Sequence, residues 1–185
     1  MLKTATMCLR PVVDDDYPFL FQIRNDLENL HLWSVRRHAL LDLESFAIEF
    51  ERDMQSDKHV FLIIEKHGQP IGFVFSYSPQ FIDQYCCVTI YLIPQKRLVG
   101  MGPLALGMFL CYLFETFNFY KIYCDVYSYN TISVNTLKRF RAELEGAFRE
   151  HRFYSGKRHD LLRFAIYSDQ QESIRSHIER ILRRK

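Results

Sequence analysis

A predicted strand, a basic loop with two glycines and an apolar helix follow one another between residues 86 and 117. Residues 86–93 are rich in β-formers and end at Pro94, and Pro103 opens a helical run that continues to residue 117. Strands and helices alternate in this way along the whole chain. The sequence therefore predicts a mixed α/β (α+β) fold built around one core.

The loop between that strand and that helix has the outline of an anion site. Backbone N–H groups in a glycine-bearing turn, aimed by the positive end of the next helix dipole, can hold a pyrophosphate without many cationic side chains. Gly100 and Gly102 lack the third glycine of GxGxxG and the Gly-Lys-Ser/Thr of a P-loop. The loop thus favours a phosphate ligand but weighs against nicotinamide and nucleoside triphosphates.

Hydrophobic periodicity places the other elements, and two hairpins join pairs of strands at residues 66–70 and 154–157. Strands are expected at residues 8–13, 60–65, 71–77, 86–93, 121–127, 147–153 and 161–167, and helices at 17–30, 41–54, 103–117, 130–140 and from 168 onward. The chain has no internal repeat and no linker long enough to divide it. We expect one domain over residues 1–168, with a basic amphipathic helix at 169–185 that packs on it or extends it.

Composition excludes several classes of protein. In 185 residues, 48% are hydrophobic and 25% charged, which rules out a disordered chain, a fibrous repeat or a coiled coil. The formal net charge of +2 gives no strong reason to expect a nucleic-acid partner, because such domains carry a basic stripe. The histidines show no metal-ligand spacing, so no metal is expected.

The cysteines and the hydropathy of the chain indicate the cellular compartment in which we expect the protein. Five cysteines without a CxxC pair, and an opening without a charged-then-apolar leader, predict a reduced, cytoplasmic protein. The longest apolar stretch, residues 103–114, is too short to cross a bilayer, so no membrane span is expected.

The loop also carries a family resemblance. Arg97, Gly100 and Gly102 resemble the Arg/Gln-x-x-Gly-x-Gly/Ala signature of the GNAT superfamily of acyl-CoA-dependent N-acetyltransferases, and the resemblance continues in order over about residues 9–167. Further matching segments are Leu9-Arg10-Pro11, Gln22 to Asp26, Gly68 to Gly72, Asn130 to Ser133, Glu145 to His151 and Gly156 to Asp160. The last three resemble the branch of ribosomal-protein N-terminal, spermidine and nucleotide-aminosugar acetyltransferases.

The resemblance implies a fold and a cofactor. The fold would be a mixed, strongly twisted and mostly antiparallel sheet of about seven strands, flanked by helices and splayed between strands four and five. Acetyl-CoA would lie in that gap, which agrees with the rule that open sheets bind ligands at the carboxyl ends of their strands. Carried over by position, the pantetheine would meet the main chain of Leu92 and Ile93, the pyrophosphate would be wrapped by Arg97, Leu98, Val99, Gly100, Met101, Gly102 and Pro103, and the thioester would face Asn130 and Ser133.

The reaction so implied is direct attack of a neutral amine on the thioester, which needs a proton acceptor and an acid for the leaving thiolate. Cys86 stands where some relatives have a general-base Glu, so Asp83 or Glu65 could take the proton through water instead. Leu137 stands where many relatives have a Tyr that acts as the general acid. Other side chains with a hydroxyl group are therefore the candidates for the acid in this chain. The candidates are Ser133, Tyr127 and Tyr129.

Each of these residues also has a structural interpretation. Ser133 could bond only its own helix backbone, Tyr127 and Tyr129 could be sheet aromatics, and the thiols of Cys86 and Cys87 could simply fill small apolar sites. A thiolate at Cys86 or Cys87 would instead permit covalent transfer.

Three functional hypotheses remain open. The first is an acetyl-CoA-dependent N-acetyltransferase that acts in a ternary complex on a protein or peptide N-terminus, a nucleotide-aminosugar or a polyamine. The alternative is a catalytically weak acyl-CoA-binding sensor or partner-binding module, because Cys86 and Leu137 stand at usual catalytic positions. In the third, the terminal helix docks on a partner or on a second copy through Ile174, Ile178 and Ile181, which would allow a homodimer.

Overall fold

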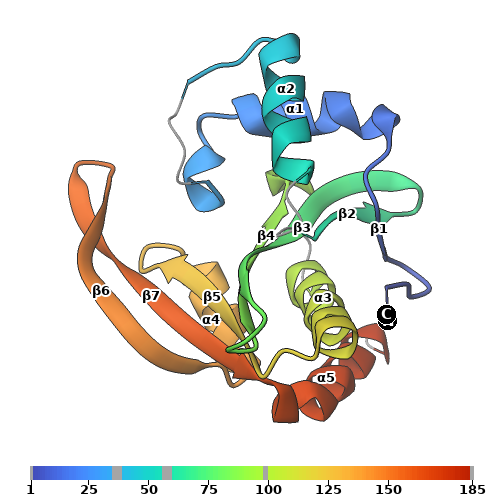
Figure 1. The fold of residues 1–185 in the computed structure, drawn as a ribbon, viewed down its shortest axis with the longest axis vertical. Helices are drawn as coiled ribbons and strands as arrows, with labels where there is room; N and C mark the ends of the chain where they lie inside the picture. The colour runs from blue at the N-terminus through green and yellow to red at the C-terminus, as the bar shows by residue number, and fades with distance from the viewer. Residues whose placement is uncertain (1, 35–38, 56–59, 98–99, 184–185) are drawn as a thin grey trace.

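A seven-stranded sheet in the order β1-β2-β3-β4-β5-β7-β6 forms the centre of the computed structural model (Figure 1). The structure describes residues 2–34, 39–55, 60–97 and 100–183, so Leu98 and Val99 of the predicted phosphate loop lie outside the described residues. The strands are β1 (Cys8–Arg10), β2 (Phe61–Lys66), β3 (Gln69–Gln80), β4 (Tyr85–Leu92), β5 (Lys121–Tyr127), β6 (Glu143–Tyr154) and β7 (Lys157–Tyr167). Neighbouring strands are antiparallel except β4 and β5, which are parallel, and this confirms the predicted fold class.

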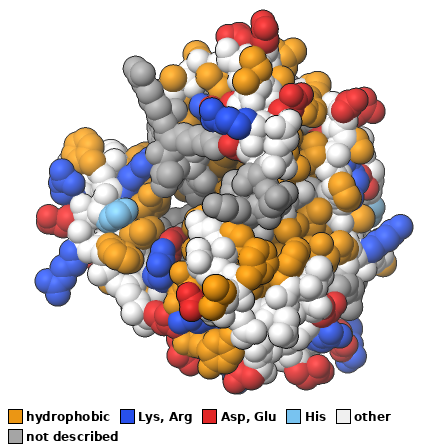
Figure 2. Space-filling view, viewed as in Figure 1, with side chains coloured by type: hydrophobic (Ala, Val, Ile, Leu, Met, Phe, Trp, Pro, Cys, Tyr) orange, Lys and Arg blue, Asp and Glu red, His pale blue; other side chains and the backbone are white. Residues whose placement is uncertain are grey.

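Helices cover both faces of the sheet (Figure 1). The helices are α1 (Tyr17–Asn25), α2 (Leu43–Met54), α3 (Met101–Phe117), α4 (Thr131–Arg139) and α5 (Gln171–Arg183), with short 3-10 turns η1 (Asp14–Asp16), η2 (Leu30–Leu32), η3 (Pro94–Lys96) and η4 (Ser168–Gln170). Helices α3 and α5 pack in the main core on one face, whereas α1 and α2 enclose a second, aromatic core over β2, β3 and β4. The space-filling view shows charges of both signs interspersed on the face that it presents (Figure 2).

The C-terminal helix α5 packs directly on α3. Ile174 and Ile178 are each 1% exposed, and a Cβ atom added to Gly107 of α3 would lie 3.0 Å from Cγ1 of Ile178. Gly107 therefore lets the two helices approach closely, and the isoleucine face that could have docked on a partner is buried within the chain. The division at residue 168 stays a prediction, but this packing supports one structural unit.

The first helix is shorter than its hydrophobic pattern predicts. The pattern continues to residue 30, but α1 ends at Asn25, and Asp26 leaves the helical region with ψ of 80°. The Asp26 carboxylate accepts hydrogen bonds from the backbone N–H and the side-chain amide of Asn29. Such local side-chain bonds compete with helix continuation, and the chain forms η2 instead.

No group of three or more His, Cys, Asp or Glu side chains that could hold a metal ion occurs in the described part of the chain. Within the same residues, none of the helices is both long and apolar enough to cross a bilayer.

The carboxylate of Asp16 is buried and hydrogen-bonded. Its carboxylate is 2% exposed and accepts bonds from Nη1 and Nη2 of Arg10, at 2.6 and 2.9 Å, and from the N–H of Val13 at 3.0 Å. Burial alone would raise the pKa of Asp16, but the hydrogen bonds from Arg10 and Val13 outweigh it and hold the pKa below its usual value. We expect Asp16→Asn to lower the free energy of unfolding at pH 7 by about 2 kcal/mol.

The sign of the pH dependence follows from that depressed pKa. The ionised carboxylate stabilises the fold above its unfolded-state pKa of about 4, and the contribution disappears as the pH falls through the lower folded-state pKa. Urea titrations of Asp16→Asn and the wild type should therefore converge in strong acid. The exposed neighbour Asp14 provides the control, and a cost as large for Asp14→Asn would refute the assignment.

Candidate active site

The parallel strands β4 and β5 part halfway along their length. They are paired only at Tyr85 with Lys121, Cys86 with Ile122 and Cys87 with Tyr123. Both strands lie wholly within the described residues, and β4 continues to Leu92 without further pairing to β5. Figure 1 shows the two strands diverging. The sheet therefore has a V-shaped gap whose open end lies at the carboxyl ends of β4 and β5, as predicted.

Alternate residues of β4 direct their backbone N–H and C=O groups toward this gap. The N–H of Ile93 donates to the carbonyl of Ile71 at 3.0 Å, and Leu92 is paired with Gly72. Because successive residues of an antiparallel strand face opposite neighbours, the N–H and C=O of Leu92 face away from β3 and into the gap, as do those of Ile90. Leu92 therefore fits its predicted role, but the N–H of Ile93 does not, since β3 already binds it. Ile90 was missed because the register was unknown.

The start of α3 presents backbone N–H groups that have no acceptor within the helix. Gly100 has φ of +85°, a left-handed conformation that favours glycine, and its carbonyl accepts the first helical bond from Leu104. The N–H groups of Met101 and Gly102 precede that bond and have no acceptor within the helix. The helix starts at Met101 rather than at Pro103, whose missing N–H costs nothing in the first turn. These groups and the helix dipole suit an anion.

Arg97 lies across the end of β4. Its Nε donates to the carbonyl of Leu92 at 2.9 Å, and its guanidinium carbon is 5.4 Å from the centre of the Tyr91 ring. The side chain thus occupies the gap-facing carbonyl of Leu92. A ligand amide that donates to this carbonyl either shares it with Arg97 or displaces the Arg97 side chain.

Asn130 and Ser133 begin α4 after the carboxyl end of β5. Oδ1 of Asn130 accepts from the backbone N–H of Ser133 at 3.2 Å, which makes Asn130 the N-cap of the helix. The hydroxyl of Ser133 has no hydrogen-bond partner among the residues described, and its side chain is part-buried. Asn130 thus has a structural task here, whereas the Ser133 hydroxyl remains able to donate to a ligand.

Tyr127 and Tyr129 belong to a cluster of rings beyond the end of β5. Their rings stack with centres 5.5 Å apart, and the Tyr129 ring lies 4.8 Å from that of Tyr154 on β6. The Tyr129 hydroxyl donates to the carbonyl of His31 at 3.3 Å, and His31 stacks on Tyr154. Burial raises the pKa of Tyr129 to about 12, so this phenol keeps its proton. The cluster ties η2 to the β6–β7 hairpin.

The two carboxylates predicted to accept the proton lie elsewhere. Asp83 is exposed in the turn before β4, and from Tyr85, where β4 begins, the seven residue steps to Leu92 span about 23 Å. Glu65 forms an ion pair with Arg10 near the β1 edge of the sheet. The structure brings neither residue to the gap, because the turn and the edge strand place them at remote ends of the sheet.

The adjacent thiols at the point of the gap are buried and neutral. Cys86 and Cys87 are 0% and 5% exposed, and burial raises their pKa to about 12 and about 11. A protonated thiol is a poor nucleophile. The arrangement therefore favours direct transfer over an acyl-cysteine intermediate.

A cavity of about 340 Å³ opens on the α1/α2 face of the sheet. Its lining residues are Leu20, Arg24, Trp33, Ser34, Phe46, Glu49, Phe50, Asp53, Met54, Phe61, Phe73, Phe75, Tyr77 and Thr89. Thr89 belongs to the half of β4 that is not paired with β5, so the cavity lies over a strand that borders the gap. We call it the aromatic pocket.

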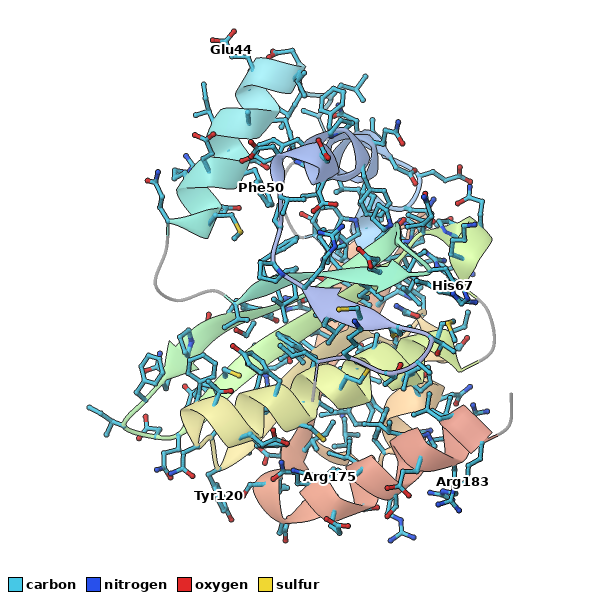
Figure 3. The ribbon with its side chains drawn as sticks, turned by 90° about the vertical axis from the view of Figure 1, so that its right-hand side faces the viewer. Glu44, Phe50, His67, Tyr120, Arg175 and Arg183 are labelled. Carbon is cyan, nitrogen blue, oxygen red and sulfur yellow. The ribbon has the colours of Figure 1, made fainter. Side chains whose placement is uncertain are left out.

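The aromatic pocket was not predicted from the sequence, although one signal of it is present there. Phe46, Glu49, Phe50 and Asp53 recur at spacings of three and four residues, which puts them on one face of α2. Figure 3 shows Phe50 beside α2 on the way to the strands, and Glu44 at the far end of the helix, pointing away. Carboxylates among the aromatic side chains of this helix therefore marked the face that lines the cavity.

Comparison with known proteins decides the family. The family description "Acetyltransferase (GNAT) domain" matches residues 6–143, which is most of the chain. The chain belongs to the GNAT acetyltransferase family. This confirms the family, the enzyme class and the acetyl-CoA co-substrate inferred from the resemblance.

Individual relatives are distant in sequence but similar over nearly their whole length. A spermidine N(1)-acetyltransferase of Escherichia coli (strain K12) is 21% identical over 171 residues, which cover 92% of this chain and 90% of that protein. A spermidine N-acetyltransferase from Vibrio cholerae, solved with CoA and spermine, has a TM-score of 0.83 at 19% identity and covers 91% of this chain and 99% of that one. RimL, a ribosomal L7/L12 alpha-N-protein acetyltransferase solved with CoA, has a TM-score of 0.80 at 15% identity, with 90% and 97% covered. At these identities the solved structures establish the GNAT fold.

Proposed function

We propose that the protein moves the acetyl group of acetyl-CoA to a primary amine by direct attack in a ternary complex. The parting of β4 from β5 beyond Cys87 and Tyr123 is the observation that carries this proposal. It leaves one edge of β4 beyond Cys87 without a neighbouring strand among the described residues, and an amide-bearing ligand can pair with that edge as a strand would.

The cofactor fits the gap from one end to the other. The N–H groups of Met101 and Gly102 would bind the pyrophosphate, helped by the dipole of α3. The pantetheine amides would meet the gap-facing main chain of Leu92 and Ile90. The thioester would then lie toward the point of the V, within reach of the aromatic pocket at Thr89.

Side chains at the end of β5 and the start of α4 support the chemistry of the transfer. The amine attacks as the neutral base, so the ammonium must first lose its proton. We assign the Ser133 hydroxyl as the donor to the leaving thiolate, because it has no competing acceptor in the described part of the chain. Tyr127 is the next candidate, whereas Tyr129 already donates to His31.

A thiol-release assay tests this function. Protein mixed with acetyl-CoA and a panel of primary amines should produce free CoA thiol together with N-acetylated amine. We expect Ser133→Ala to lower kcat about 100-fold and to leave the KM for acetyl-CoA unchanged. Alanine keeps the capping bond, because Asn130 binds the backbone N–H of residue 133.

Thr136 provides a matched control one turn along α4. Its hydroxyl is exposed and donates to the carbonyl of Ile132, so Thr136→Val should retain full activity. Equal losses in the two variants would refute the assignment of Ser133. Tight binding of acetyl-CoA without turnover of any amine would instead support the acyl-CoA-binding sensor.

The acceptor and the assembly stay predictions. A polyamine, a peptide N-terminus and an aminosugar were all open from the sequence, and the distant relatives are described as acting on spermidine or on a ribosomal protein. One relative from Vibrio cholerae is described as dodecameric, which supports testing self-association of this chain.

A further inference from the structure

We propose that the acceptor is the N-terminal amine of a polypeptide whose following residues are acidic, and that the β6–β7 hairpin binds this acidic segment. The inference rests on the proposed acetyl transfer and chooses among the classes of amine left open above. The part of the hairpin that carries it is residues 149–159, which we call the basic arm.

The basic arm concentrates positive charge. It carries four cations against the single carboxylate of Glu150, and the cations are Arg149, Arg152, Lys157 and Arg158. The side chains of Arg149, Lys157 and Arg158 are exposed and form no ion pair with any described residue. In Figure 2 the lobe at the left, which is this hairpin in Figure 1, presents mainly Lys and Arg among its charged side chains. Such a surface attracts an acidic segment and repels a polyamine.

Ring contacts attach the basic arm to the carboxyl end of β5, where the gap opens. The guanidinium carbon of Arg152 lies 5.5 Å from the centre of the Tyr127 ring, which ends β5. The Tyr154 ring stacks on the rings of Tyr129 and His31, with centres 4.8 and 4.1 Å apart. Tyr127 is paired with Leu161 of β7, and the hairpin continues beyond that pair to its turn. The arm therefore extends outward from the open end of the gap.

The spacing along β7 sets which residues of a peptide meet the basic arm. Asp125 lies two residues beyond the last pair of β4 with β5 and is paired with Arg163 of β7. From Arg163, the four residue steps to His159 span about 13 Å and the six steps to Lys157 about 20 Å. An extended peptide also advances by about 3.3 Å per residue. With its amine at the point of the gap, residues five to seven of the peptide would lie along the arm.

A polypeptide suits the basic arm better than a compact anion does. Five residue steps separate Arg149 from Tyr154, the pairing partner of Lys157, which is up to about 17 Å along the strand. A series of carboxylates can reach both of these cations, whereas one diphosphate group is too short. Phe153 is 66% exposed between them in sequence and offers apolar contact area to a peptide.

The experiment compares peptide acceptors at saturating acetyl-CoA. Three peptides share the same first four residues and carry three Glu, three Gln or three Arg residues at positions five to seven. We expect kcat/KM for the Glu peptide to exceed that for the Gln peptide about tenfold, with the Arg peptide poorer still. Because salt screens exposed charges, this advantage should shrink when the NaCl concentration rises to about 0.5 M.

The other outcomes separate this inference from the proposed function. Equal kcat/KM for the three peptides would overturn the inference and leave acetyl transfer intact. Faster acetylation of spermidine or of a nucleotide-linked aminosugar than of the Glu peptide would do the same. Absence of turnover with every amine would overturn both.

Charge variants test the basic arm itself. We expect Arg149→Gln together with Lys157→Gln to raise the KM for the Glu peptide about tenfold, with unchanged KM for acetyl-CoA and unchanged kcat/KM for the Gln peptide. Lys138→Gln together with Arg139→Gln is the matched control, because these two cations at the carboxyl end of α4 are also exposed and without an ion pair among the described residues. An unchanged KM for the Glu peptide in the first double variant, or an equal rise in the control, would refute the arm as the binding surface.

Discussion

Gly72→Ala is expected to lower the free energy of unfolding by about 3 kcal/mol, the largest loss of stability predicted for any single methyl group in this chain. Gly72 lies opposite Leu92, where β3 and β4 approach most closely. A Cβ atom there would lie 2.0 Å from the carbonyl oxygen of Tyr91 and 2.9 Å from Cα of Leu92. Both are backbone atoms, so no rotamer change relieves the clash and the end of β4 must move.

Urea denaturation measures the loss, and a second glycine controls for it. Gly146 in β6 has nothing within 4 Å of its added Cβ, so Gly146→Ala should stay within about 0.5 kcal/mol of the wild type. Because Gly72→Ala displaces Leu92, it should also weaken acetyl-CoA binding. Wild-type stability in Gly72→Ala would show that β3 and β4 are not in this register.

Saturating acetyl-CoA is expected to raise the melting temperature by about 5–10 °C. A ligand at 100 times its Kd stabilises the fold by about 2.7 kcal/mol, and a domain of this size gains about 2–4 °C for each kcal/mol. The physical reason lies in the sheet, since the ligand supplies β4 with the neighbour that β5 does not provide. Hydrogen exchange should therefore slow most in residues 88–92.

ADP provides the control for that measurement. It carries the pyrophosphate but no pantetheine, so it should protect the start of α3 and leave residues 88–92 unchanged. Stabilisation by acetyl-CoA without protection of β4 would contradict the gap as the cofactor site.

The sequence was sufficient for most of the fold because hydrophobic period and turn residues agree along the chain. The family resemblance also predicted the parting of β4 from β5 correctly, and the cofactor residues placed in that gap stay a prediction. The end of α1 was missed, since the apolar pattern continues past Asn25 while the Asp26 side chain stops the helix. Local competition of this kind does not show in periodicity.

The finer features of the site depended on register and on distant packing. Whether the backbone groups of Ile90 or of Ile93 face the gap depends on whether the even-numbered or the odd-numbered residues of β4 bond to β3. Only the pairing with the neighbouring strand decides this. Asp83 was plausible by chain proximity to β4 but lies at its wrong end. The aromatic pocket needs α1, α2 and three strands together, so its residues are scattered over most of the first half of the chain.

The contact between Gly100 and the last turn of α5 links the carboxyl end of the chain to the phosphate loop. A Cβ atom on Gly100 would lie 3.2 Å from Cγ2 of Ile181, so the terminal helix packs closely against the left-handed residue that precedes α3. Binding of a partner to the last turn of α5, or its removal by truncation, would take away this packing against Gly100. We therefore expect shortening of α5 from its carboxyl end to weaken binding of the nucleotide end of acetyl-CoA through the conformation of Gly100.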